Sequence, residues 1–177
     1  MNRVEQFCTT LEAERRYSAH TVAGYRHDIS AFLSWLEVDA ESFDAESITR
    51  DNITDWAIYL FEKQGLKATS VNRYLASLRS FWSWLRKCGY ANHDIMRGVS
   101  TFKTPKRLPT FVPDSRMMDV VEELKEDIAS DDEVRLRDAL ILLLIYTCGL
   151  RLSELVEANR EDVASDFSSI RVMGKGS

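Results

Sequence analysis

The chain has 177 residues, of which 45% are hydrophobic, which is enough to fill a core and excludes a largely disordered protein. Seven glycines and three prolines are too few for an all-β protein with many turns, so the composition favours helices. The net charge of −5 at pH 7 excludes a uniformly basic nucleic-acid binder, yet residues 67–107 carry nine basic side chains and one acidic side chain. This segment is either a solvated surface or a site whose local field attracts a phosphate backbone.

Apolar residues at helical spacing predict four helices within residues 1–98, and a short fifth helix is expected around residues 94–98. Ser18 and Thr49 are expected N-caps of the second and third helices, because their hydroxyl oxygens can accept from the first amide groups. The fourth helix begins near Thr69. Its apolar stripe consists of Val71, Tyr74, Leu75, Leu78, Phe81, Trp82 and Leu85, and the opposite face carries Thr69, Asn72, Arg73, Ala76, Ser80 and Lys87.

A proline-containing stretch separates these helices from a second set. Residues 101–113 hold all three prolines, and proline is excluded from helix interiors, so we expect a basic linker over residues 99–112. Helices are expected over about residues 114–128 and 132–147, and the apolar second half of the latter is typical of a central core helix. A short helix is expected over residues 152–158.

The last residues predict a strand that lacks a partner. Residues 168–173 alternate and contain β-branched side chains, and Gly174-Lys175-Gly176 is expected to begin a turn. Because one strand cannot satisfy its own backbone groups, a partner strand is expected to follow. We therefore interpret the chain as interrupted inside a domain.

Cys8, Cys88 and Cys148 are far apart in the sequence, with no CxxC pair and no histidine at ligand spacing. This usage predicts neither a zinc site nor a disulfide framework, and it favours a reducing cytoplasmic location. The first residues do not resemble a signal peptide, and the longest apolar run, residues 139–146, is too short to span a bilayer. We expect no membrane association.

An arginine follows the apolar helix within the stretch Thr147-Cys-Gly-Leu-Arg-Leu-Ser-Glu-Leu155. Taken alone, Arg151 is most simply a surface residue beyond a helix end, where the helix dipole favours a cation. Glu154 lies on the same helical face and is expected to hold the guanidinium. Lys175 follows the predicted strand inside Gly-Lys-Gly.

These elements at this spacing resemble the first part of the catalytic domain of tyrosine recombinases, and the upstream helices resemble the core-binding domain of the same family. The resemblance covers the whole chain. The residues that carry it upstream are Ser18, Tyr25, Phe32, Trp35 and Leu36 in the second helix and Thr69, Leu78, Arg79, Phe81, Trp84 and Leu85 in the fourth.

The resemblance implies a mainly α protein with three parts. Residues 1–98 would form a SAM-like core-binding bundle of four to five helices, and residues 99–112 a basic, Pro-containing linker. Residues 113–177 would be the helical start and first β-strand of an α+β catalytic domain. Because the core-binding domain begins almost at Met1, the chain is more similar to simple Xer-type chromosome-dimer resolvases than to larger phage and transposon integrases.

Members of this family cleave DNA by attack of a tyrosine, form a 3′-phosphotyrosyl link and transfer the strand to a 5′-hydroxyl. The resemblance implies that Arg151 stabilises charge on the non-bridging phosphate oxygens and that Lys175 delivers a proton to the leaving 5′-oxygen. Glu154 would orient the arginine, and no metal or other cofactor is needed. The family's His-x-x-Arg and its nucleophile would lie beyond Ser177, so this chain alone is expected to bind DNA without cutting it.

The implied partners are double-stranded DNA and, for the full-length protein, other recombinase subunits in a tetramer on two duplexes. The resemblance places the second and fourth helices against the duplex, with the linker crossing its backbone. Two alternatives remain open, a natural non-catalytic DNA-binding protein or regulator built on the same domain and a helical protein-interaction module with a solvated basic stretch. The expected DNA contacts are Lys67, Thr69, Asn72, Arg73, Lys103, Lys106 and Arg107.

Overall fold

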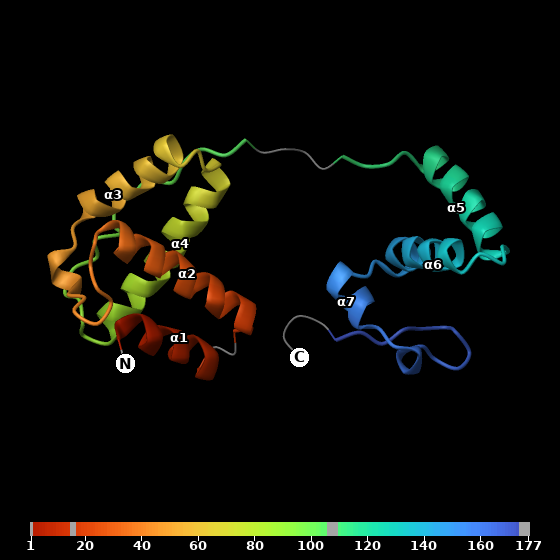
Figure 1. Ribbon diagram of the computed structural model, residues 1–177, viewed down its shortest axis with the longest axis horizontal. Helices are drawn as coiled ribbons and strands as arrows, with labels where there is room; N and C mark the ends of the chain where they lie inside the picture. Colours follow the sequence, from red (N-terminus) through yellow and green to blue (C-terminus); the bar gives the residue numbers. More distant parts are fainter. Residues whose placement is uncertain (1, 15–16, 106–109, 174–177) are drawn as a thin grey trace. The chain divides into compact units, whose positions relative to one another are not determined.

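The computed structural model describes residues 2–14, 17–105 and 110–173, and the chain divides into two units, Met1–Arg107 and Leu108–Ser177 (Figure 1). Each unit is described by itself. Helices dominate the described residues and no strand is present among them, which confirms the mainly α expectation. The finer division into residues 1–98, 99–112 and 113–177 stays a prediction.

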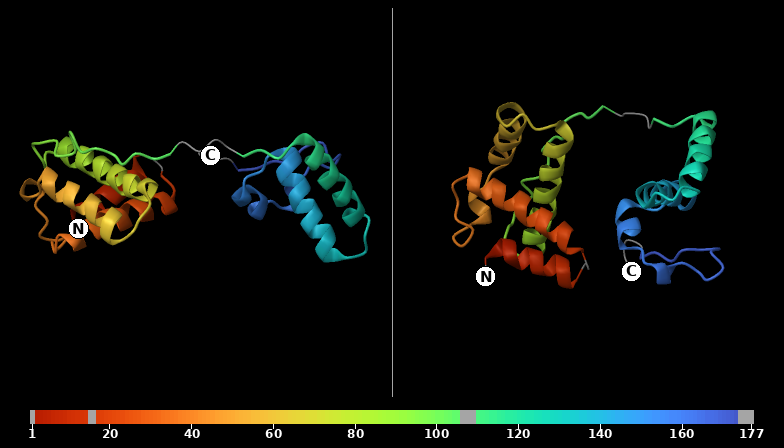
Figure 2. Two further views of the ribbon diagram at one scale, coloured as in Figure 1. Left: turned by 90° about the horizontal axis from the view of Figure 1, so that it is seen from above. Right: turned by 45° about the vertical axis from the view of Figure 1, so that its right-hand side comes forward.

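The N-terminal unit is a four-helix bundle. Helix α2 packs against both α1 and α4, and the two views of Figure 2 show these three helices side by side. Helix α3 continues directly into a π-helical turn, η2, which also contacts α4. The bounds are α1 Arg3–Ala13, α2 Ala19–Trp35, η1 (a 3₁₀ turn) Ala45–Ser47, α3 Arg50–Ile58, η2 Tyr59–Lys63 and α4 Ala68–Lys87.

The short fifth helix expected around residues 94–98 is not formed. This segment makes turns, with hydrogen bonds from the Arg97 N–H to the Asp94 carbonyl and from the Val99 N–H to the Met96 carbonyl, and with Gly98 at a φ of +86°. A positive φ is incompatible with a continuing right-handed helix, so the chain turns away at Gly98.

Two predicted caps are confirmed at the starts of α2 and α3. The Ser18 side chain accepts from the Thr21 N–H at 3.3 Å. Thr49 Oγ1 accepts from the Asn52 N–H at 3.3 Å, while Asn52 Oδ1 accepts from the Thr49 N–H at 2.9 Å, which makes a reciprocal capping pair. By contrast, α4 begins after Lys67 with no side-chain cap.

The core of the N-terminal unit is large and aromatic. The ring centroids of Phe32 and Trp56 lie 5.0 Å apart, and those of Phe7 and Phe81 lie 5.3 Å apart. Pairs at such distances add about 0.5–1.5 kcal/mol each beyond the burial of their area. These four rings, with Trp82, are almost completely buried and come from all four helices, so they fix α2 against α4.

The C-terminal unit is also helical. Helix α6 packs on α5 and on α7 (Figure 1). Asp132 caps α6 by accepting from the Val134 and Arg135 amides, and Gly149, at a φ of +64°, ends it. The bounds are α5 Asp114–Ile128, α6 Glu133–Cys148, α7 Leu152–Glu157 and η3 (a 3₁₀ turn) Arg160–Asp162.

The expectation that α6 is a central core helix is wrong for the described residues. Of its side chains only Ala139 is fully buried, whereas Leu142 is 51% and Tyr146 54% exposed. The reason is that α5 and α7 pack on only part of its surface. The other apolar side chains of α6 therefore remain partly exposed in the described chain.

The strand expected over residues 168–173 is not formed either. An isolated antiparallel bridge joins Val163 to Ile170, and it is flanked by hydrogen bonds from the Ala164 N–H to the Ser169 carbonyl and from the Arg171 N–H to the Asp162 carbonyl. A strand requires a longer ladder of paired groups, which the described residues do not supply. The predicted turn at Gly174-Lys175-Gly176 lies outside the described residues.

Candidate nucleic-acid interface

A buried carboxylate joins α2 to α4 in the N-terminal unit. Asp28, on α2, is completely buried, and both of its carboxylate oxygens accept from Arg73 Nη1 at 2.7 Å. Ser77, one turn further along α4, donates to the same carboxylate at 2.6 Å. A buried charge is tolerated when it is paired and hydrogen-bonded, and here both partners come from one helix.

The guanidinium of Arg73 is held from a second side by an aromatic ring. It lies 4.6 Å from the ring centroid of Tyr74, which in turn makes an edge contact with Trp56 at 5.4 Å. The Tyr74 hydroxyl also lies 3.4 Å from His27 Nε2. The Arg73 side chain nevertheless remains 53% exposed, so a fixed cation faces solvent on α4.

Asn72 has both ends of its amide engaged inside the unit. Its Nδ2 donates to the Phe102 carbonyl at 2.9 Å, and its Oδ1 accepts from the Phe102 N–H at 2.8 Å. The Phe102 ring packs against Phe61, with centroids 4.9 Å apart. Asn72 therefore ties α4 to Phe102, which lies within the expected linker, and both of these hydrogen bonds serve the fold.

The remaining predicted DNA contacts fall into two groups. Lys67, Thr69 and Lys103 are exposed, and in the part of the chain that the structure describes no hydrogen bond or ion pair holds their side chains. Lys67 and Thr69 lie with Arg73 at the start of α4. Lys106 and Arg107 lie outside the described residues.

Sequence reasoning missed Asp28 and Ser77, although each carries a signal. Asp28 lies three residues after Tyr25 and four before Phe32, so it falls on the apolar stripe of α2. Ser77 stands in the same relation to Tyr74 and Phe81 on α4. A charged residue on an apolar stripe indicates a buried polar partner, because an unpaired buried charge is strongly unfavourable.

The C-terminal unit holds Arg151 at the N-cap position of α7. The Arg151 backbone N–H donates to one carboxylate oxygen of Glu154 at 2.9 Å, and Arg151 Nη1 donates to the other oxygen. These bonds, first from the backbone amide and then from the guanidinium, lower the pKa of Glu154 below its ordinary value. The Glu154 side chain is largely buried, whereas that of Arg151 is 69% exposed, so the arginine is fixed at one nitrogen and open beyond it.

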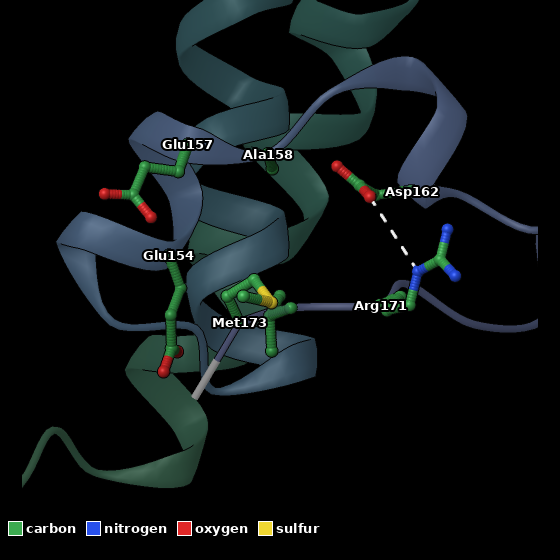
Figure 3. Close-up of a pocket in the computed structure, with 7 residues that line it drawn as sticks. Glu154, Glu157, Ala158, Asp162, Arg171 and Met173 are labelled. Carbon is green, nitrogen blue, oxygen red and sulfur yellow. Dashed lines mark ion pairs between the residues drawn. The ribbon is translucent and has the colours of Figure 1, made fainter. Parts of the chain in front are cut away.

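A small cavity of about 150 Å³ lies beside this pair (Figure 3). Glu154, Glu157 and Asp162 line it with carboxylates, and the one cation on its wall, Arg171, has its Nε 3.9 Å from Asp162 Oδ1. Arg151 does not line it. Its acidic wall disfavours a phosphate, so the cavity is not an anion site. Lys175, the other predicted catalytic residue, lies outside the described residues.

Two kinds of feature are absent from the described part of the chain. No group of three or more His, Cys, Asp or Glu side chains in residues 2–14, 17–105 and 110–173 is arranged to hold a metal ion. No helix in that same part of the chain is long and apolar enough to cross a membrane.

The class of the N-terminal unit follows from its helices and from a family comparison. Residues 4–89, which run from α1 to the end of α4, match the phage integrase N-terminal SAM-like domain. The four helices of this unit thus match a SAM-like domain, in agreement with the expected core-binding bundle.

The whole chain is similar in sequence to Xer-type tyrosine recombinases. It is 32% identical to tyrosine recombinase XerD of Listeria monocytogenes, covering 98% of this chain and 57% of that protein. It is 32% identical to tyrosine recombinase XerC of Xanthomonas axonopodis pv. citri, covering 100% of this chain and 59% of that protein. The chain thus spans rather more than half the length of the curated relatives it matches.

Solved structures agree at the level of the fold. The Tn1549 transposon integrase in complex with transposon right end DNA matches with a TM-score of 0.59 and 15% identity, covering 93% of this chain and 50% of that one. The integrase from mycobacterium phage Brujita matches with a TM-score of 0.51 and 21% identity, covering 98% of this chain and 54% of that one. Both likenesses concern the fold alone.

Proposed function

We propose that the protein acts in site-specific DNA recombination and that the present residues form the DNA-binding part of a tyrosine recombinase. Such an enzyme cleaves and rejoins DNA through a 3′-phosphotyrosyl intermediate. Similarity to XerC and XerD over nearly the whole chain supports this assignment. The geometric observation that carries it is Arg73, a cation anchored by a buried carboxylate yet half exposed at the start of α4 in a SAM-like domain.

In the proposed domain organisation, residues 1–98 form the core-binding domain, residues 99–112 form a basic linker and residues 113–177 form the first part of a catalytic domain. Lys67, Thr69, Arg73 and Lys103 are proposed to contact the DNA backbone, and Asn72 is reassigned from DNA contact to anchoring the linker. Exposed cations supply most of the salt-dependent affinity for a phosphate backbone. Lys106 and Arg107 are proposed contacts that lie outside the described residues.

In the C-terminal unit we propose that Arg151 binds the non-bridging oxygens of the scissile phosphate. A guanidinium stays charged and presents donors in a planar fork, which suits the charge that develops on a phosphate in the transition state. Glu154 engages Nη1 and the backbone N–H of Arg151, which supports a role in orienting the remaining donors. Lys175 is proposed to donate the proton to the leaving 5′-oxygen.

The whole enzyme is proposed to work as a tetramer on two DNA duplexes, with other recombinase subunits as partners. The alternative is a non-catalytic DNA-binding protein or regulator built on the same domains. Both bind duplex DNA, so binding alone does not separate them. Reading the coding frame beyond codon 177 does, because a downstream His-x-x-Arg and tyrosine are expected only for the enzyme.

The test of DNA binding is fluorescence anisotropy with a labelled duplex between 50 and 200 mM salt. We expect Lys67→Ala and Lys103→Ala each to weaken binding and to reduce the slope of log K against log salt by roughly 0.9, the value of one phosphate contact. Lys125→Ala, an exposed lysine on α5 outside the proposed contacts, is the matched control. Binding that does not depend on salt, or equal effects of all three substitutions, would contradict the assignment.

A further inference from the structure

Asp28 and Ser77 are the buried polar or charged residues of the described chain, and they contact each other at 2.6 Å. A carboxylate buried between two helices is costly unless its partners compensate, and an apolar side chain of similar volume often packs there with equal or greater stability. The bundle core around Asp28 is otherwise apolar and aromatic. The carboxylate is therefore poorly explained by stability alone.

In the structure, Asp28 fixes the orientation of the Arg73 guanidinium. Both carboxylate oxygens accept from Nη1 of Arg73 at 2.7 Å, and Ser77 holds one of those oxygens in place. The ring of Tyr74, itself packed on Trp56, lies against the guanidinium. The arginine is thus constrained at its inner nitrogen and on one face.

The outer edge of the same guanidinium is unoccupied within the described chain. No hydrogen bond there involves Nε or Nη2 of Arg73, and the side chain is 53% exposed. Nε and Nη2 present two parallel N–H groups, which match two acceptor atoms side by side, as on a phosphate or on the major-groove edge of guanine.

We propose that Asp28 is a positioning residue for DNA binding, which presets Arg73 so that its two-donor edge meets a pair of acceptors on the duplex. This proposal rests on the proposed function. An unrestrained arginine loses much side-chain freedom when it binds, and a side chain already held in its bound orientation loses less. Asp28 therefore raises affinity without touching DNA itself.

The experiment is a double-mutant cycle on duplex affinity with Asp28→Asn and Arg73→Lys. Asp28→Asn is nearly isosteric and keeps an oxygen for Ser77, and Arg73→Lys keeps a cation beside Asp28 but removes the two-donor edge. We expect Asp28→Asn to weaken binding roughly two- to tenfold, the equivalent of ordering one rotamer-rich side chain. In the Arg73→Lys background the same substitution should have no effect on affinity.

Several outcomes would overturn the proposal. Unchanged or tighter binding by Asp28→Asn would mean that the carboxylate does not preset the arginine, or that it merely neutralises it. An equal loss of affinity in both backgrounds would assign Asp28 a purely structural role. Circular dichroism and thermal melting of each variant identify any that fails to fold, and Ser77→Ala, which removes one support of the carboxylate, gives a second variant with a smaller expected loss.

The outcomes of this experiment also distinguish a failure of this proposal from a failure of the proposed function. If the unmodified chain shows no salt-dependent binding to duplex DNA, the proposed function fails. If it binds and Asp28→Asn binds equally well, only the role of Asp28 fails. An Asp28→Asn effect of the same size on a duplex of A·T pairs assigns the acceptors to phosphate, and an effect confined to guanine-containing duplexes assigns them to guanine.

Discussion

Asn72 on α4 exchanges two hydrogen bonds with the backbone of Phe102, thirty residues further along the chain. The Asn72 amide thereby satisfies both backbone polar groups of Phe102, as a neighbouring strand would in a sheet. The contact holds the first part of the expected basic linker, residues 99–112, against the helical bundle. Asn72, which was expected from the sequence to contact DNA, therefore also has a role within the fold.

The first prediction concerns the two hydrogen bonds between Asn72 and Phe102. Asn72→Ala leaves the Phe102 N–H and carbonyl without their partner and should lower the free energy of unfolding by about 1–3 kcal/mol. Urea denaturation checks this value. Thr69→Ala, at an exposed site on the same helix, should change stability by less than about 0.5 kcal/mol. A stable Asn72→Ala protein with weakened DNA binding would instead return Asn72 to the DNA contacts.

The second prediction concerns pH. Arg26 binds both oxygens of Glu5 at 2.9 Å, and this hydrogen bonding lowers the pKa of Glu5 from its ordinary value of 4.5. The folded state therefore binds the proton less readily than the unfolded state, so the stabilisation is present above pH 4.5 and is lost as the pH falls through the folded pKa.

Glu5→Gln removes this contribution. The difference in melting temperature between the unmodified protein and Glu5→Gln should be positive at neutral pH and should shrink as the pH is lowered below about 4.5, the ordinary carboxyl value. The effect is small because both side chains are about 40% exposed to screening solvent. Glu12→Gln, on the same helix, serves as the control. A difference that grows in acid would contradict the argument.

The third prediction uses two glycines with opposite expected signs. Gly24 lies inside α2, where an added Cβ meets nothing within 4 Å, so Gly24→Ala should stabilise the protein by about 0.5–1 kcal/mol. Gly65 has equal space but a φ of +64°, so Gly65→Ala should destabilise by roughly 1–2 kcal/mol. Thermal melting of the two variants checks the pair. Stability changes of the same sign in the two variants would show that the backbone φ does not determine the effect of adding a Cβ at these glycines.

The fourth prediction tests how Glu154 holds the start of α7. Glu154→Gln weakens the bonds to the Arg151 backbone and guanidinium, which should loosen the first turn of this short helix. Amide hydrogen exchange at Leu155, whose N–H donates to the Arg151 carbonyl, should become faster. Glu157→Gln, also on α7, should leave this rate unchanged. Equal rates in both variants would mean that the carboxylate does not stabilise the turn.

The order of the helices and several of their ends followed from the sequence alone. Helical periodicity predicted α1 to α7, and Ser18 and Thr49 cap the helices that they were expected to cap. These features depend on residues within one or two turns of each other, so local chemistry decides them. The motif around Arg151 likewise indicated the family, because it is a contiguous stretch.

The tertiary structure decided which polar residues serve the fold and which face solvent. The distance along the chain from Asp28 to Arg73 is 45 residues and from Asn72 to Phe102 is 30, so no local pattern reveals either pair. The strand expected over residues 168–173 failed for the same reason, since its formation depends on partners elsewhere in the chain. Helices satisfy their backbone hydrogen-bonding groups internally. Strands, buried charges and anchoring amides instead need partners that only the tertiary fold brings close.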